Sequence, residues 1–142
     1  MSETARIVVG VDGSEGSKAA LQWAARQAKL TGASLDVVAA WDFPATYGWV
    51  PVPPEDLDFA GFAEKSLTDT LGEVFGADIP ASLQHRVIQG HPAEVLVEAS
   101  KGAELLVVGS RGYGGFTDAL LGSVSTYIAH HAHGAVTIVR PV

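Results

Sequence analysis

The segment from Gly109 to Ser125 reads GSRGYGGFTDALLGSVS and combines closely spaced glycines with hydroxyl side chains. Glycine permits positive φ and lets a ligand approach the main chain without a Cβ in the way. Successive backbone N–H groups in such a loop, together with those at a helix N-terminus, form a site for an anion. The segment is therefore a candidate cradle for phosphate groups, with a merely flexible connection as the alternative.

Two common nucleotide-binding motifs do not occur in this segment. The Walker A motif requires G-x-x-x-x-G-K-[ST], which neither this segment nor Gly13–Lys18 (GSEGSK) supplies. The dinucleotide fingerprint G-x-G-x-x-G starts at Gly112 but meets Thr117 at its sixth position. The spacing that is present is G-x2-G-x9-G-S, from Gly109 to Ser123.

The elements around this segment alternate between strand and helix patterns. Strands are expected at Arg6–Val11, Ser34–Trp41, Ser82–Ile88, Glu104–Gly109 and Val136–Arg140. Helices are expected at Ser17–Leu30, Asp56–Phe75, Ala93–Ser100 and Thr117–His130. Most of the strand runs are apolar on both faces, as in a buried parallel sheet, whereas Ser82–Ile88 alternates and indicates an edge strand. The order predicts one α/β domain with a doubly wound parallel sheet.

Asp12 directly follows the first expected strand, and Gly109 ends a later one. If the strand order reverses between these two strands, both residues lie at the crevice where such folds bind ligands. A carboxylate beside phosphates is repulsive unless a cation bridges them, so we hypothesise a Mg²⁺ or Mn²⁺ ion at Asp12. The alternative is that Asp12 caps the turn of the following D-G-S.

Composition limits the remaining classes of function. The 142 residues suffice for one domain, and the net charge of -7 disfavours a nucleic-acid partner. The chain has no cysteine, which excludes disulfides and Cys-based metal or redox sites. The first apolar run is too short for a secretion signal or a membrane span. We therefore expect a cytoplasmic protein that does not associate with membranes.

The G-x2-G-x9-G-S spacing resembles the universal stress protein family, whose nucleotide-binding members carry G-x2-G-x9-G-[ST]. The resemblance extends to Ile7–Ser14 (IVVGVDGS) and Gly90–Glu94 (GHPAE) and covers essentially residues 1–142 as one universal stress protein domain. It implies a five-stranded parallel sheet in the order 3-2-1-4-5, a Rossmann-like fold of the adenine nucleotide alpha hydrolase-like type.

The resemblance also implies a site for ATP, or for ADP or AMP. The residues it carries over are Gly10, Asp12, Ala40, Val108, Gly109, Arg111, Gly112, Gly122, Ser123, Val124 and Ser125. Gly109 and Gly112 would give close backbone approach to ribose and phosphates. Residues 122–125 would hold the phosphate tail by N–H and hydroxyl donation.

Other positions of the implied site surround the nucleotide. Gly10 and Ala40 would line the adenine and ribose slot, with Val108 beside them. Asp12 corresponds to the acidic residue that the family places at the nucleotide. Arg111 either contacts a phosphate or points to solvent.

The leading functional hypothesis is a binding protein in which ATP is a regulatory ligand of a stress response, with no catalytic residue assigned. The resemblance implies a homodimer formed through the last strand, and the apolar segment Val136–Val142 fits that role. Two alternatives are a slow ATPase or phosphotransferase and an interaction dimer that needs no nucleotide.

The histidines His130, His131 and His133 are interpreted as helix-capping residues and not as metal ligands.

Overall fold

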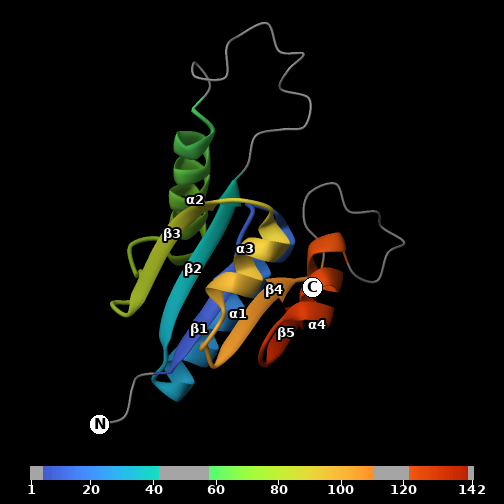
Figure 1. Cartoon of the computed structure of the whole chain (residues 1–142). Helices are drawn as coiled ribbons and strands as arrows, with labels where there is room; N and C mark the ends of the chain where they lie inside the picture. Colours follow the sequence, from blue (N-terminus) through green and yellow to red (C-terminus); the bar gives the residue numbers. More distant parts are fainter. Residues whose placement is uncertain (1–4, 42–57, 111–121, 141–142) are drawn as a thin grey trace, which may run out of the picture.

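A single parallel sheet of five strands organises the protein. The computed structural model describes residues 5–41, 58–110 and 122–140. The strands are β1 (Arg6–Gly10), β2 (Ser34–Trp41), β3 (Leu83–Gln89), β4 (Leu105–Gly109) and β5 (Val136–Val139). Their spatial order is β3-β2-β1-β4-β5, and all pairs are parallel (Figure 1). The α/β class and the strand order expected from the sequence are confirmed, including the edge position of β3.

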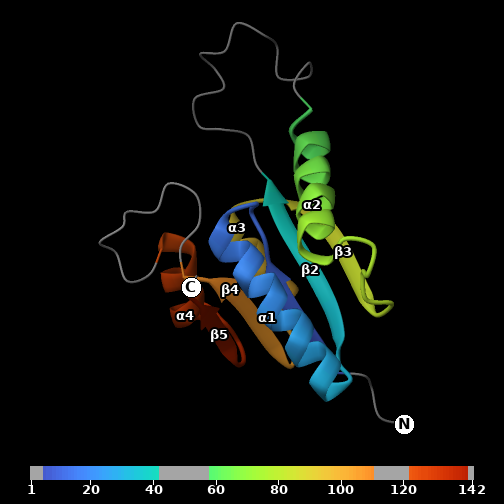
Figure 2. The same cartoon turned by 180° about the vertical axis from the view of Figure 1, so that it is seen from behind.

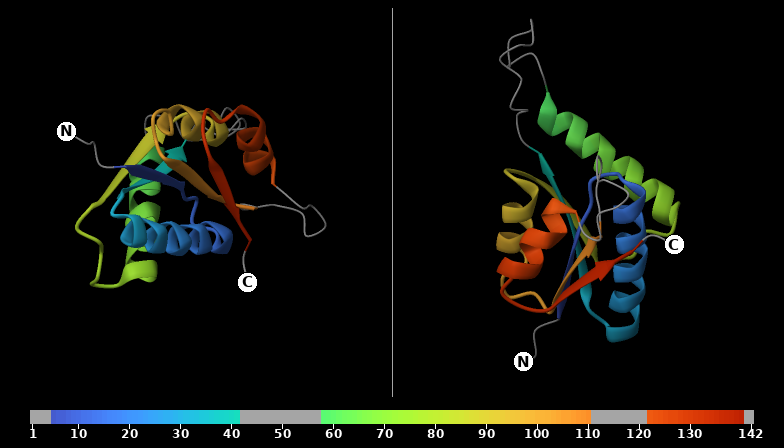
Figure 3. Two further views of the ribbon diagram at one scale, coloured as in Figure 1. Left: turned by 90° about the horizontal axis from the view of Figure 1, so that it is seen from below. Right: turned by 90° about the vertical axis from the view of Figure 1, so that its right-hand side faces the viewer.

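Two helices cover each face of the sheet. The helices are α1 (Glu15–Thr31), α2 (Phe59–Phe75), α3 (Pro92–Ala99) and α4 (Ser123–His131). α3 and α4 lie in front of the sheet in Figure 1, whereas α1 and α2 cover the face seen in Figure 2, and the edge-on view of Figure 3 separates the three layers. None of the helices in the described ranges is long and apolar enough to cross a bilayer.

The alternation of side chains along the strands divides the core into two clusters. Val9 of β1 is fully buried against α1 and α2, in a cluster that includes Leu21. Val8, one residue earlier, is fully buried on the other face together with Ile128 of α4. Strands that are apolar on both faces are required by this three-layer arrangement, which explains the nearly continuous hydrophobic runs.

Capping side chains set the helix boundaries. The Ser14 hydroxyl accepts a hydrogen bond from the N–H of Ser17 at the start of α1, which ends at Gly32 in the left-handed conformation. Asp58 accepts from the N–H of Gly61, so that α2 begins at Phe59. The predicted start at Asp56 lies outside the described residues, and the sequence did not identify Asp58 as the cap, because apolar spacing does not reveal which acidic residue caps a helix.

The strand order reverses between β1 and β4. The chain adds β2 and β3 on one side of β1, and then crosses to build β4 and β5 on the other side. Val9 of β1 is the register partner of Val107 of β4, so the two strands end at the same edge of the sheet. This edge is the topological switch point at which open α/β sheets bind their ligands.

Candidate functional site

The carboxyl ends of β1 and β4, with the start of α4, define the candidate site. Asp12 lies two residues beyond β1, and Gly109 is the last residue of β4. The chain returns to the same place at Gly122, whose N–H donates a hydrogen bond to the carbonyl of Ser110. The predicted site residues Arg111 and Gly112 lie outside the described residues.

Asp12 has an exposed side chain and an identifiable local role. Its Oδ1 accepts a hydrogen bond of 2.9 Å from the N–H of Ser14, and its own N–H donates to Oγ of Ser17 at 3.3 Å. These bonds shape the turn between β1 and α1, so the turn role considered from the sequence is confirmed. The role of Asp12 toward a nucleotide or a metal ion stays a prediction.

Gly109 is required by the packing of β4 on α1. A Cβ at this position would lie 2.8 Å from both the carbonyl carbon and the oxygen of Gly16, and 3.2 Å from the nitrogen of Ser17. These atoms belong to the main chain and cannot rotate away. Sequence reasoning missed this contact with Gly16, because it arises only where the end of β4 meets the start of α1.

The predicted slot residues Gly10, Ala40 and Val108 all lie on the α3–α4 face. A Cβ at Gly10 would lie 2.5 Å from Cδ1 of Leu96, so this glycine permits close packing of α3 on the sheet. Ala40 and Val108 pack in the core cluster of that face, and Val108 is only 4% exposed. All three residues therefore have packing roles, and their contact with a nucleotide stays a prediction.

α4 begins later than the sequence suggested. Gly122 has an extended backbone, with φ -75° and ψ 171°, and is the N-cap of a helix that starts at Ser123. The helix predicted over Thr117–His130 is therefore wrong at Gly122, and residues 117–121 lie outside the described residues. Glycine is a poor helix former, and the N–H of Gly122 is bonded to Ser110 and not to a helical carbonyl.

The corrected boundary places three site residues in the first turn of α4. Ser123, Val124 and Ser125 occupy its first three positions, and the first intrahelical bond runs from the N–H of Thr126 to the carbonyl of Gly122. N–H groups at such positions have no acceptor within the helix. Together with the helix dipole they make this end of α4 suitable for a phosphate group.

The hydroxyl of Ser125 has a structural role that the sequence did not indicate. Its Oγ donates to the carbonyl of Ser110 at 2.9 Å and lies 3.1 Å from that of Gly122, and the residue is 2% exposed. The hydroxyl is bonded to the main chain, and its donation to a phosphate stays a prediction. Ser110, also 2% exposed, was not identified from the sequence; its carbonyl holds the end of β4 to the start of α4.

His130 and His131 bond carbonyls near the end of α4, as the helix-capping interpretation predicts, whereas for His133 that interpretation stays a prediction. Nδ1 of His130 donates to the carbonyl of Thr126, and Nδ1 of His131 to that of Tyr127, each at 2.9 Å. Within the described ranges, no three His, Asp or Glu side chains are grouped closely enough to hold a metal ion.

Comparison with known proteins places the chain in a family. The family model described as the universal stress protein family matches residues 3–140. The chain belongs to the universal stress protein family. A universal stress protein of Mycolicibacterium smegmatis is 36% identical over 94% of the chain. The chain spans about half the length of this curated relative, 47% of it.

Solved structures agree with the family and with the fold. The universal stress protein UspA from Lactobacillus plantarum matches 99% of the chain and 100% of its own length, with a TM-score of 0.79 and 25% identity. A universal stress protein crystallised in complex with cAMP matches 99% of the chain and 100% of its own length, with a TM-score of 0.67 and 26% identity. The universal stress protein fold therefore extends over the whole described chain.

Proposed function

We propose that this universal stress protein binds an adenine nucleotide, with ATP as the preferred ligand, at the crevice between β1 and β4. The observation that carries the proposal is the start of α4, where three first-turn residues follow an extended glycine at the switch point. The G-x2-G-x9-G-S spacing and the cAMP complex of a relative of the same fold support it.

In this proposal the phosphates lie on the N-terminus of α4. The N–H groups of Ser123, Val124 and Ser125 and the exposed Ser123 hydroxyl donate to phosphate oxygens. Gly122 leaves the main chain beside the phosphates without a Cβ atom, and Gly109 lets the end of β4 pack closely on the start of α1. Asp12 would hold a Mg²⁺ or Mn²⁺ ion that accompanies the nucleotide, and the charge of that ion would offset the repulsion between the carboxylate and the phosphates.

The nucleotide acts as a regulatory ligand in a cytoplasmic homodimer. β5 lies at the edge of the sheet, and its residues Val136–Val139 (VTIV), three of them apolar, are only half-buried. An antiparallel strand from a second copy would cover this edge.

The net charge of -7 favours a small-molecule ligand over nucleic acid. Sedimentation of the protein with and without ATP measures the assembly.

A substitution at Ser123 tests the backbone contact directly. Proline is tolerated at the first position of a helix, and the extended Gly122 has the conformation that precedes proline. Ser123→Pro removes the N–H and the hydroxyl while preserving the helix start, whereas Ser123→Ala removes only the hydroxyl. Loss of charge-assisted hydrogen bonds should weaken ATP binding by about 10- to 100-fold in the proline variant.

Calorimetric titration of both variants with ATP, ADP and AMP, with and without Mg²⁺, supplies the measurement. Equal ATP affinity in the proline variant and the unaltered protein would contradict the proposed phosphate position. Formation of ADP or AMP in the same samples separates regulation from catalysis, because turnover of many ATP molecules per second would require the enzymatic alternative. Failure of ATP to bind at all would favour the nucleotide-independent dimer.

A further inference from the structure

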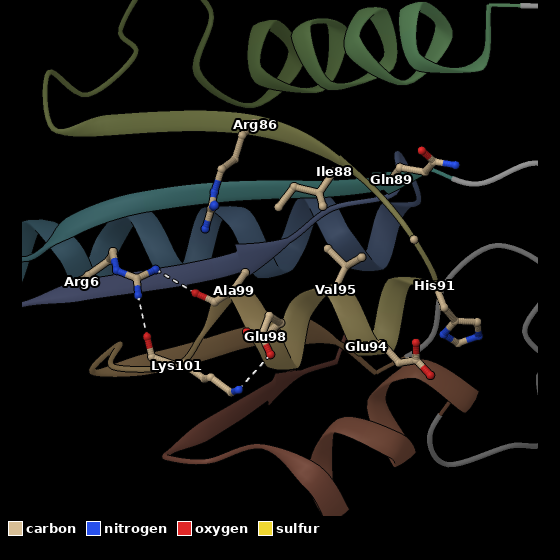
Figure 4. Close-up of a pocket in the computed structure, with 11 residues that line it drawn as sticks. Arg6, Arg86, Ile88, Gln89, His91, Glu94, Val95, Glu98, Ala99 and Lys101 are labelled. Carbon is tan, nitrogen blue, oxygen red and sulfur yellow. Dashed lines mark hydrogen bonds and ion pairs between the residues drawn. The ribbon is translucent and has the colours of Figure 1, made fainter.

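A groove of about 560 Å³ runs between α3 and the edge strand β3, away from the contact of β4 with α4 (Figure 4). Its volume lies within the range of small-molecule sites. Ile88 of β3 and Val95 of α3 lie on opposite sides of the groove, and Ala99 extends its apolar lining along α3. The groove exists because α3 packs over the central strands and leaves this face of β3 half-covered.

One end of the groove rests on an ion cluster formed by Arg6, Asp36 and Arg86, of which only the carboxylate is buried. These residues come from three adjacent strands, and Asp36 is 6% exposed. Its Oδ2 accepts from Nη1 of Arg6 at 3.3 Å and from Nη2 of Arg86 at 2.9 Å. Two guanidinium groups share one carboxylate, so the cluster carries one excess positive charge.

The two arginines differ in what they offer to the groove. Arg6 also donates to the carbonyls of Ala99 and Lys101, at 3.0 and 2.9 Å, and thereby caps the end of α3. Arg86 bonds only Asp36 within the described part of the chain, through Nε and Nη2, and its side chain is 47% exposed. The excess charge is therefore presented to the groove by Nη1 of Arg86.

The other charges near the groove do not neutralise Arg86. Lys101 and Glu98 pair with each other at 2.9 Å. Glu94 lies in the first turn of α3, at the opposite end of the groove beside His91 (Figure 4). The groove is thus cationic at Arg86, apolar along Ile88 and Val95, and polar at its far end.

We propose that the groove between α3 and β3 binds an organic anion with an apolar body, its carboxylate on Arg86 and its chain along Ile88 and Val95. A guanidinium with free donors recognises a carboxylate strongly, and the adjoining apolar surface gains by covering a hydrocarbon chain. The site is separate from the proposed nucleotide site and does not rest on it. One protein molecule therefore binds the nucleotide and the organic anion at the same time.

Titration of ¹⁵N-labelled protein with decanoate tests the proposal, with decanol and decyltrimethylammonium as neutral and cationic probes of equal chain length. Decanoate should give saturable shifts at residues 86–99 and should bind at least about ten times more tightly than either probe. The shifts should persist in the presence of saturating ATP. An absence of saturable shifts at these residues, or equal affinity for all three probes, would overturn the proposal.

Variants assign the contact to its residues. Arg86→Gln should weaken decanoate binding at least about tenfold. Lys65→Gln, on α2 across the sheet, removes a cation that also pairs with an aspartate and should leave binding unchanged. Ile88→Glu provides a second test that leaves the ion cluster intact, because a carboxylate in the apolar stretch should repel the probe to a similar extent. Unchanged decanoate affinity in a folded Arg86→Gln or Ile88→Glu protein would place the anion elsewhere.

Discussion

The crevice between β1 and β4 and the groove between α3 and β3 differ in whether the main chain or the side chains supply the binding groups. The crevice presents main-chain groups: the first N–H groups of α4, and strand ends that carry glycine. The groove presents side chains, with Arg86 held by the buried Asp36. A site made of main chain depends on close packing and on helix boundaries, whereas a site made of side chains depends on the residue types themselves. The following substitutions separate these two dependences.

Loss of the buried carboxylate should produce the largest change in stability. Asp36→Asn leaves two guanidinium groups beside a neutral amide, and we expect it to lower the free energy of unfolding by about 2–3 kcal/mol. This loss of unfolding free energy should be smaller than for a fully buried ion pair, because the side chains of Arg6 and Arg86 are 33% and 47% exposed. Urea unfolding provides the measurement.

The matched control for Asp36→Asn is Asp69→Asn. Asp69 pairs with Lys65 on the surface of α2, and its loss should change the unfolding free energy by less than about 0.5 kcal/mol. ATP affinity should be unchanged in both variants. A similar cost for both substitutions would show that the cluster under the groove is no more important than a surface pair.

A methyl group at Gly109 should be the next most damaging change. Gly109→Ala places Cβ against the main chain of Gly16, and we expect a loss of about 2 kcal/mol because neither backbone segment can move freely. A loss of ATP affinity in this variant would not by itself report on phosphate approach, because the methyl group also disturbs the packing of α1. Thermal unfolding should therefore precede any titration.

Gly10→Ala is the matched comparison on the opposite face of the sheet. Its methyl would meet the end of the Leu96 side chain, which can change rotamer, so the cost should be smaller, about 1 kcal/mol. A second substitution, Leu96→Ala, should relieve the clash, so that the double variant loses less stability than the sum of the losses of the two single variants. Equal cost of the two glycine variants would contradict the distinction between backbone and side-chain neighbours.

Ser125→Ala separates positioning from direct contact in the crevice. Removing the hydroxyl leaves the carbonyl of Ser110 with one donor fewer, and we expect a loss of about 1 kcal/mol in stability with a parallel weakening of ATP binding. Ser123→Ala should change stability much less, because Ser123 is exposed. Unfolding and calorimetry on both variants give the comparison, and a Ser125 variant as stable as the Ser123 variant would contradict the positioning role.

The smallest effect concerns Lys18, which joins α1 to α2 on the face away from the groove. Hydrogen bonding to Glu73, and then to Glu15, raises the pKa of Lys18 above its ordinary value of 10.5. Its contribution to stability is therefore fully present below pH 10.5 and is lost as the pH rises through the raised value. The melting-temperature difference between the unaltered protein and Lys18→Gln should be small at pH 8 and should shrink toward pH 11.5. A melting-temperature difference that grows with pH would contradict a stabilising role for the charged Lys18.

The sequence predicted the strands better than it predicted the helix starts. β1, β2 and β4 follow from runs of aliphatic residues such as Ile7–Val11, because burial on both faces requires nearly continuous apolar residues. Helical spacing, in contrast, continues through a glycine without revealing that the chain is extended there. For that reason α4 was predicted to start at Thr117, whereas Gly122 is its N-cap.

The amino-acid sequence by itself determined the α/β class, the family and the spacing of the glycines, because these depend on residue types and on their order along the chain. Only the tertiary structure decided which groups those glycines face. Gly109 meets Gly16, Gly10 meets Leu96, and Ser125 turns inward to Ser110. It also brought Arg6, Asp36 and Arg86 from three strands into one cluster. Contacts between residues distant along the chain follow from the order and register of the strands, which no local pattern encodes.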